Sequence, residues 1–273
     1  MVRTLGTKGT KLIHTLAKEN NLLFSIKDAM KITRSTYKTT EELIRHLLNK
    51  NWLMSIKNGK YAILPLEAGM ENVNPYNWFV IARELISPNP YYISYYSAMS
   101  IHNMITQPLR VVYIASPHRY RDKNIGTTRF KFVYTKEEKL WGISKEWVTH
   151  QEQVDVSNLE RTIIDCLYIP EYCGGVSEIA KGIWITRNKI DYKKLYDYAC
   201  RFNKNVIIKR LGFILENYEI DTENIIMLLN KRAQERNSYP LFDPMFPDEG
   251  EYIKKWRLKV NLKPSELKAI VRT

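Results

Sequence analysis

Cysteine is scarce in this sequence, and its few copies form no recognisable pattern. Three cysteines occur in 273 residues. Because three cannot all pair within one chain and none belongs to a C-x-x-C motif, we expect free thiols in a reducing compartment. No histidine stands at ligand spacing beside Cys166 and Cys173, so the sequence predicts no metal site.

Long hydrophobic runs are also absent. No apolar stretch approaches the roughly 18 residues that a membrane-spanning helix needs, and the first residues lead into no signal-peptide core. Hydrophobic residues make up 44% of the chain and charged residues 26%, which is typical of a folded globular protein. We therefore expect a cytoplasmic protein with no membrane partner.

The familiar catalytic motifs are missing as well. The sequence contains no G-x-S-x-G, no G-x-x-x-x-G-K-[ST], no H-E-x-x-H and no H-x-E with C-x-x-C. Glu160 and Asp165 suggest a carboxylate pair, but they stand five residues apart and Arg161 is a ready partner for either, which favours a structural ion pair. We expect no catalytic residue, no cofactor and no enzymatic activity.

Acidic residues are too few to balance the basic ones. The formal net charge is +13 and the pI is near 9.5. Residues 1–66 hold twelve Lys and Arg against four Asp and Glu, a net charge of +8. This N-terminal excess favours a polyanionic partner, because cationic side chains that neutralise phosphates release condensed counterions.

The N-terminal region does contain a regular pattern of helices. Apolar residues at helical spacing between residues 10 and 24 predict a first helix that ends at the polar pair Asn20-Asn21. Ser25 is a good N-cap for a short helix over 26–31. After a break at 33–35, spacings of three and four predict a longer helix at about 36–50. The pattern is typical of a helix-turn-helix.

Two strand-like segments, 52–56 and 60–64, follow these helices. Asn58-Gly59 between them is the strongest short-range signal for a two-residue hairpin turn, in which both central residues take a positive φ. A helix-turn-helix followed by such a hairpin predicts a winged helix-turn-helix over residues 1–66, with the hairpin as the wing.

The expected DNA contacts follow from this arrangement. Tyr37, Ile44 and Leu47 are assigned to the core face, so we expect the opposite face to reach the major groove of double-stranded DNA. The wing tip is expected on the DNA backbone or in the minor groove. The predicted DNA-binding residues are Arg34, Ser35, Lys38, Thr39 and Arg45 in the helical part, and Lys57, Asn58 and Lys60 in the wing. The alternative is a protein-docking winged helix whose cations are merely solvated.

A domain boundary is expected after the wing. Pro65 stops the second strand, and the polar stretch 67–75 predicts a linker. Residues 76–273 mix helical and strand-like patterns and predict a mixed α/β domain. The expected fold class is therefore α+β, with an N-terminal winged helix-turn-helix followed by that domain.

Several segments of the chain resemble the AbiEi antitoxins, which are predicted transcriptional regulators of viral defence. These antitoxins belong to the AbiE abortive-infection systems, a type IV toxin–antitoxin class. The resembling segments are 91–94, 97–99, 107–108, 156–165, 174–175 and 209–212. The most specific blocks run from Glu160 to Asp165 and from Lys209 to Gly212. The sequence departs from the family pattern at Asn103-Met104, where Gly-Leu is expected.

The resemblance implies two activities. The winged helix is expected to repress the protein's own promoter as a transcriptional regulator. The C-terminal domain is expected to neutralise a separately encoded nucleotidyltransferase-like toxin of the AbiEii kind. The resemblance implies no catalytic residues.

A basic loop is the candidate for contact with the toxin. A nucleotidyltransferase active site is acidic where it holds metal, and it would attract cations. The candidate contact residues are His118, Arg119, Arg121, Lys123, Arg129 and Lys131, with Tyr120 among them. A solvated surface and a second DNA contact are the alternatives for this loop.

The alternative function is a DNA-targeted enzyme, such as a nuclease delivered by the winged helix. Metal-assisted cleavage would need clustered carboxylates with a lysine on adjacent strands. The strand-like segments between residues 110 and 154 do not supply such a cluster.

Overall fold

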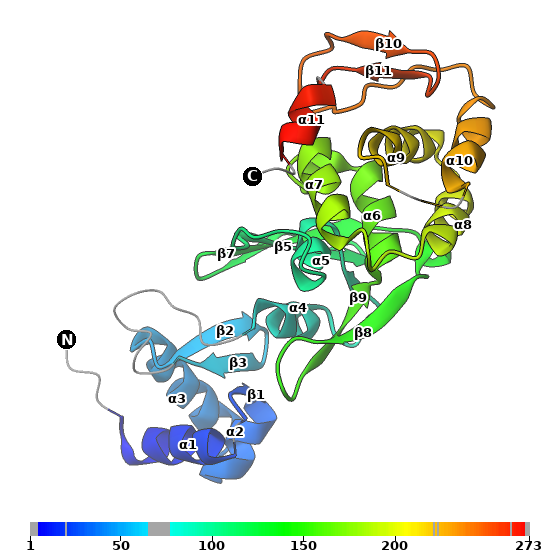
Figure 1. The fold of residues 1–273 in the computed structure, drawn as a ribbon. Helices are drawn as coiled ribbons and strands as arrows, with labels where there is room; N and C mark the ends of the chain where they lie inside the picture. Colours follow the sequence, from blue (N-terminus) through cyan, green and yellow to red (C-terminus); the bar gives the residue numbers. More distant parts are fainter. Residues whose placement is uncertain are drawn as a thin grey trace. The chain divides into compact units, whose positions relative to one another are not determined.

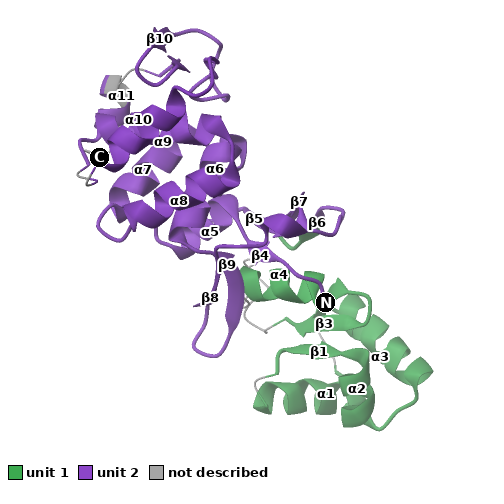
Figure 2. Ribbon diagram, turned by 90° about the vertical axis from the view of Figure 1, so that its right-hand side faces the viewer, with its two compact units in different colours: residues 1–87, 124–127 green, residues 88–123, 128–273 purple. Residues whose placement is uncertain are grey.

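The computed structural model describes residues 5–19, 21–64, 77–220, 222, 224–262 and 264–270. The chain divides into two compact units, coloured separately in Figure 2. Unit 1 comprises residues 1–87 with 124–127, and unit 2 comprises residues 88–123 with 128–273. The described part contains eleven α-helices and three β-sheets (Figure 1). The α+β class is therefore confirmed.

Unit 1 combines helices with a small sheet. Its elements are α1 (Thr7–Lys18), β1 (Leu23–Ser25), α2 (Ile26–Thr33), α3 (Tyr37–Asn49), β2 (Leu53–Lys57), β3 (Lys60–Ile63) and α4 (Trp78–Ile86). The strand order is β1-β3-β2, and both pairings are antiparallel. One apolar core joins α1, α2 and α3 to the sheet. Its buried members include Leu12, Leu16, Phe24, Ile44, Leu47 and Trp52.

Local sequence explains where α2 and α3 begin. Ser25 forms a capping box, because its Oγ accepts from the Asp28 N–H and its own N–H donates to the Asp28 carboxylate at 2.8 Å. Thr36 caps α3 by accepting from the Thr39 N–H. Both helices start within a residue of their predicted positions.

The first helix begins earlier than expected. The apolar pattern began at residue 10 and was expected to end at Asn20-Asn21, whereas α1 runs from Thr7 to Lys18. Phe24 belongs to β1 and pairs with Tyr61 of β3. A strand of three residues has no periodicity of its own, so only its long-range pairing reveals it.

The hairpin turn also differs from its prediction. Gly59 has a positive φ of 73°, but Asn58 does not. The β2–β3 pairing shifts register between Ser55 and Lys57. Ile56 is the extra residue of this β-bulge, and a bulge changes the local twist of the strand that leads into the turn.

Unit 2 contains most of a six-stranded mixed sheet in the order β6-β7-β5-β4-β9-β8. The strands are β4 (Tyr92–Ile93), β5 (Val111–Ser116), β6 (Lys123–Ile125), β7 (Thr128–Tyr134), β8 (Ile143–Trp147) and β9 (Gln153–Ser157). The β5–β7 and β4–β9 pairs are parallel, and the β4–β5 and β8–β9 pairs are antiparallel.

Helices make up the rest of unit 2. They are α5 (Tyr95–Ile101), α6 (Leu159–Tyr168), α7 (Val176–Thr186), α8 (Tyr192–Phe202), α9 (Asn205–Asn217), α10 (Ile225–Ala233) and α11 (Pro264–Ile270). A short hairpin, β10 (Glu251–Ile253) and β11 (Leu258–Val260), precedes α11. Helix α6 packs against α5, α7, α8 and α9, in the middle of this helical layer (Figure 1). Within the described ranges, no helix has the length and apolar character needed to cross a bilayer.

Helix α6 carries the structural ion pair that the sequence predicted. Arg161 Nε donates to Asp165 Oδ1 at 2.9 Å, and the two side chains are 1% and 3% exposed. Glu160 is not part of this pair, because its carboxylate binds Lys194 at 2.7 Å. The Arg161 guanidinium also donates to the carbonyls of Lys139 and Trp141 and to the Tyr92 hydroxyl. This hydrogen bonding offsets the cost of burying the charges.

The division into units differs from the expected domain boundary. The predicted linker, residues 67–75, lies outside the described residues. Helix α4 falls within the expected 76–273 domain, but it groups with unit 1 because it packs against β2. The boundary between the units comes after Ser87.

Candidate nucleic-acid interface

Helix α3 turns one face to the core of unit 1 and the other to solvent. Thr40, Ile44 and Leu47 are buried. Tyr37, which was assigned to the same face, is instead 56% exposed. It is the first residue of α3, one turn before the core contact begins. The described residues exposed on this helix and the turn before it include Arg34, Lys38, Thr39 and Arg45.

Three of these exposed side chains are cations. Arg34 lies in the turn between α2 and α3, and Lys38 lies in the first turn of α3. Arg45 follows seven residues later on α3, about 10 Å further along the helix axis. None of the three forms an ion pair with another described residue. Their charges are therefore available to an outside partner.

The predicted hydroxyl contacts are partly engaged within unit 1. Ser35 Oγ accepts from Lys8 Nζ of α1 at 3.0 Å and lies 3.3 Å from the Thr33 carbonyl oxygen, to which it donates. Thr39 Oγ1 lies 3.1 Å from the Oγ1 of the N-cap Thr36. Lys8 therefore joins the turn before α3, a position that the helical spacing of α1 alone did not indicate.

The hairpin lysines are also engaged, and both contact α4. Lys60 Nζ lies 2.8 Å from Glu84 Oε2. Lys57 Nζ donates to the backbone carbonyl of Ser87, the residue that ends α4, at 2.8 Å. Burial lowers the pKa of Lys57, an effect that Glu84 opposes. Asn58 at the tip is exposed. The two hairpin lysines therefore have partners inside unit 1, whereas the cations of α3 and of the turn before it form no ion pair with another described residue.

The candidate toxin-contact residues do not form one surface. Arg119 stacks on the ring of Tyr134, with its guanidinium carbon 4.5 Å from the ring centre. Arg129 and Lys131 belong to the same strand as Tyr134 but are an odd number of residues from it. They therefore point to the opposite side of β7. Arg119 therefore lies on one side of β7, and Arg129 and Lys131 lie on the other.

Several of these cations are also bound internally. Arg129 pairs with Asp122 at 2.7 Å. Lys131 Nζ lies 4.2 Å above the ring of Tyr172. Burial lowers the pKa of Lys123. His118 and Arg121 are exposed. Arg119 and Arg129 are exposed as well, but within the described residues only His118 and Arg121 of the exposed candidates have side chains without an ion pair, hydrogen bond or ring contact.

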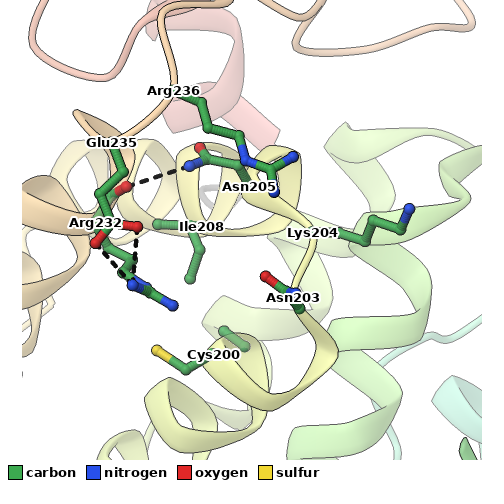
Figure 3. Close-up of a pocket in the computed structure, with 9 residues that line it drawn as sticks. Cys200, Asn203, Lys204, Asn205, Ile208, Arg232, Glu235 and Arg236 are labelled. Carbon is green, nitrogen blue, oxygen red and sulfur yellow. Dashed lines mark hydrogen bonds and ion pairs between the residues drawn. The ribbon is translucent and has the colours of Figure 1, made fainter.

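Unit 2 also contains a small cavity of about 50 Å³ where the ends of α8 and α10 meet the start of α9 (Figure 3). Arg232 on its wall binds both oxygens of Glu235, at 2.7 and 2.8 Å. Lys204 extends away from Arg232 (Figure 3). The cations around this cavity therefore do not converge on one point.

The cysteines are free thiols. Cys166 and Cys173 are buried, and Cys200 is half-buried. Burial raises the pKa of the Cys166 thiol. Over the described part of the chain, no three His, Cys, Asp or Glu side chains gather closely enough to hold a metal ion.

The comparisons with known proteins bear on the fold. No protein-family profile matches the sequence, and no curated protein matches it. Among solved structures, the chain is similar to the RV2827C protein from Mycobacterium tuberculosis, with a TM-score of 0.76 at 12% sequence identity. The alignment covers 100% of this chain and 97% of that one. The likeness therefore extends over both units and concerns their fold.

Proposed function

We propose that this chain is a DNA-binding transcriptional regulator whose N-terminal unit is a winged helix-turn-helix. The observation that carries the proposal is the start of α3, where Arg34 and Lys38 are exposed and have no acidic partner among the described residues. In a helix-turn-helix, the N-terminal residues of the second helix contact base edges in the major groove. The element order of unit 1 agrees with this docking mode, because α2 and α3 are followed by the β2–β3 hairpin.

Electrostatics support the same partner. The N-terminus of α3 carries the positive end of its helix dipole, and the two cations add to it. Tyr37 is exposed beside Lys38 and adds an aromatic surface to the proposed contact. Phosphate contacts would give affinity, and base contacts by Lys38 or Arg34 would give specificity.

We further propose that unit 2 is an antitoxin domain that neutralises a nucleotidyltransferase-like toxin encoded beside it. The support is the sequence resemblance to the AbiEi antitoxins. Its two most specific blocks are core positions in the structure: Arg161 and Asp165 form the buried pair of α6, and Lys209 and Gly212 are buried in α9. The resemblance therefore lies in the core of unit 2. It does not identify the surface that contacts the toxin, which must be found by experiment.

The test of DNA binding uses the full-length protein. Its affinity is measured for a duplex from upstream of its own gene and for a shuffled duplex of the same composition, over a series of salt concentrations. We expect tighter binding to the upstream duplex and a steep loss of affinity with salt. Replacing Lys38 by Ala should cost about 1–3 kcal/mol of discrimination if it contacts a base.

Lys193→Ala is a matched control, since it removes an exposed cation of α8 in unit 2. We expect it to leave the ratio of the two affinities unchanged. Equal affinity of the wild-type protein for the two duplexes would contradict the proposed regulator. An unchanged ratio in both Lys38→Ala and Arg34→Ala would reject these residues as base contacts.

A further inference from the structure

The β2–β3 hairpin brings two like charges together. Lys57 and Lys60 are directly opposite one another in the strand register. Like charges in this position repel one another and destabilise a strand pair. Each lysine is therefore expected to have a compensating contact, and both find it on α4.

The two compensating contacts lie at the same end of α4. Glu84 is in the last turn of the helix, and it binds Lys60 at 2.8 Å. Ser87, directly after the helix, accepts from Lys57 through its carbonyl. The C-terminus of a helix carries the negative end of its dipole, which favours cations there. The end of α4 thus offers the hairpin lysines an anionic site inside unit 1.

The ion pair between Lys60 and Glu84 is partly buried. The Lys60 and Glu84 side chains are 33% and 17% exposed. Burial alone would raise the pKa of Glu84, but the hydrogen bond and charge of Lys60, with the charges of Arg83 and Lys57, outweigh it and lower this pKa. Glu84 is therefore ionised at neutral pH and surrounded by cations.

A DNA phosphate would compete with this carboxylate. If Lys60 contacts a phosphate while it remains 2.8 Å from Glu84, two anions come close together and repel one another. If Lys60 leaves Glu84, the carboxylate remains partly buried and loses its main partner. In either case, a DNA contact made by the hairpin costs free energy. A DNA contact made by the free cations of α3 does not carry this cost.

We propose that α4 is an intramolecular competitor of DNA, in which Glu84 holds Lys60 in an autoinhibitory contact that DNA phosphate must displace. This inference rests on the proposed DNA-binding function. Because phosphate contacts carry no sequence information, Glu84 limits general affinity for DNA and leaves discrimination to α3.

The test replaces Glu84 by Gln in the full-length protein. We expect Glu84→Gln to bind both the upstream and the shuffled duplex about three- to tenfold more tightly near 0.1 M salt, with a salt dependence steeper by about one ion. The ratio of the two affinities should not change. In a Lys60→Ala background the same substitution should tighten binding no more than the general loss of one negative charge does, because the competing cation is gone.

Glu19→Gln is the matched control for net charge, since it neutralises an exposed carboxylate that follows α1 in the same unit. It should tighten binding far less than Glu84→Gln. An equal gain in Glu19→Gln, an equal gain in the Lys60→Ala background, or no gain at all would overturn the proposal. Failure of the wild-type protein to bind any duplex would instead overturn the proposed function.

A second measurement needs no substitution. The side-chain carboxyl carbon of Glu84 is followed by NMR in the wild-type protein while a short duplex is added. If DNA draws Lys60 away, this resonance shifts together with the amides of β2 and β3. A Glu84 resonance that stays in place while α3 amides shift would overturn the autoinhibitory contact and leave DNA binding by α3 intact.

Discussion

Arg34 has a backbone conformation that arginine rarely takes. Its φ and ψ are 50° and 45°, in the left-handed region, where it ends α2 and donates its N–H to the Met30 carbonyl. Glycine is the usual residue at such a position, because a Cβ costs about 1 kcal/mol there. Retaining a strained, exposed cation directly before α3 agrees with a binding role.

This strain leads to a prediction with opposite signs for stability and binding. Arg34→Gly should raise the free energy of opening of α2 and α3 by roughly 0.5–1 kcal/mol, while it weakens binding to the upstream duplex. Arg34→Ala should weaken binding similarly without the gain in stability. Amide hydrogen exchange measures the opening of these helices, and fluorescence anisotropy measures the binding. Tighter binding by either variant would contradict the role assigned to Arg34.

Lys209 is a fully buried cation. Its Nζ donates to the backbone carbonyls of Arg236 and Ser238, and it has no carboxylate partner among the described residues. Burial, followed by the charges of Arg257 and Arg236, lowers its pKa from 10.5 to about 8. Between these two pH values, the unfolded chain binds a proton at this site and the folded protein does not.

The direction of the resulting pH effect follows from proton linkage. Stability rises with pH where the unfolded state holds more protons. The free energy of unfolding of unit 2 should therefore rise from about pH 8 to pH 10.5, as the cost of burying a charged Lys209 is lost. Since tyrosines also titrate at alkaline pH, the test compares thermal unfolding of the wild-type protein and Lys209→Met across this range. The difference between them should change with pH in this window, and a constant difference would contradict the lowered pKa.

At the scale of elements, the indole ring of Trp256 packs closely against the backbone of α9 at Gly212. A Cβ added at Gly212 would lie 2.0 Å from Cζ3 of Trp256. The ring is also held by a hydrogen bond to the same helix, because Trp256 Nε1 donates to Glu216 Oε2 at 2.7 Å. Close packing therefore explains a glycine in the middle of this helix, where it is otherwise unfavourable.

Gly212→Ala should consequently destabilise unit 2, although alanine is the better helix former. The clash should cost about 1–3 kcal/mol or more, because the ring has little room to move. Gly6→Ala is a suitable comparison, since a Cβ there meets nothing within 4 Å. Urea unfolding measures both variants. A Gly212→Ala protein as stable as Gly6→Ala would show that Trp256 can move away at no cost.

Elements defined by local patterns could be predicted from the sequence, and those defined by distant pairing could not. Apolar spacing and the Ser25 and Thr36 caps indicate α2 and α3 at nearly their observed positions. The β1 strand and the parallel β4–β9 pair, which joins Ile93 to Val156, depend on contacts far apart in the chain. Tyr37 was misplaced because helical periodicity was extended to the first residue of α3, which is exposed.

At the scale of the whole molecule, the same distinction applies to the candidate interface. The excess of basic residues could be counted from the sequence, and the free cations of α3 agree with it. The engagement of Lys57 and Lys60 could not be foreseen, because their partners lie 24 to 30 residues away on α4. Arg119, Arg129 and Lys131 are close in sequence, but strand alternation in β7 turns Arg129 and Lys131 away from Tyr134, on which Arg119 stacks.

The two units allow the two proposed activities to be separated in the full-length protein. A double variant, Arg34→Ala with Lys38→Ala, changes only exposed side chains of unit 1. We expect it to lose preference for the upstream duplex and still protect cells that express the neighbouring toxin. A second double variant, His118→Glu with Arg121→Glu, adds negative charge at two exposed positions of the basic loop in unit 2. It should still bind the upstream duplex and recover less toxin in a pull-down.

Duplex binding, cell survival and toxin recovery are measured for both double variants, and circular dichroism checks that each is folded. Opposite charges steer association, so charge reversal should reduce capture of an acidic partner more than removal of charge elsewhere. Loss of protection in the folded α3 variant would show that neutralisation depends on DNA binding and would contradict the division of labour. Undiminished toxin recovery by the charge-reversed variant would reject the basic loop as the contact while leaving the antitoxin proposal open to another surface of unit 2.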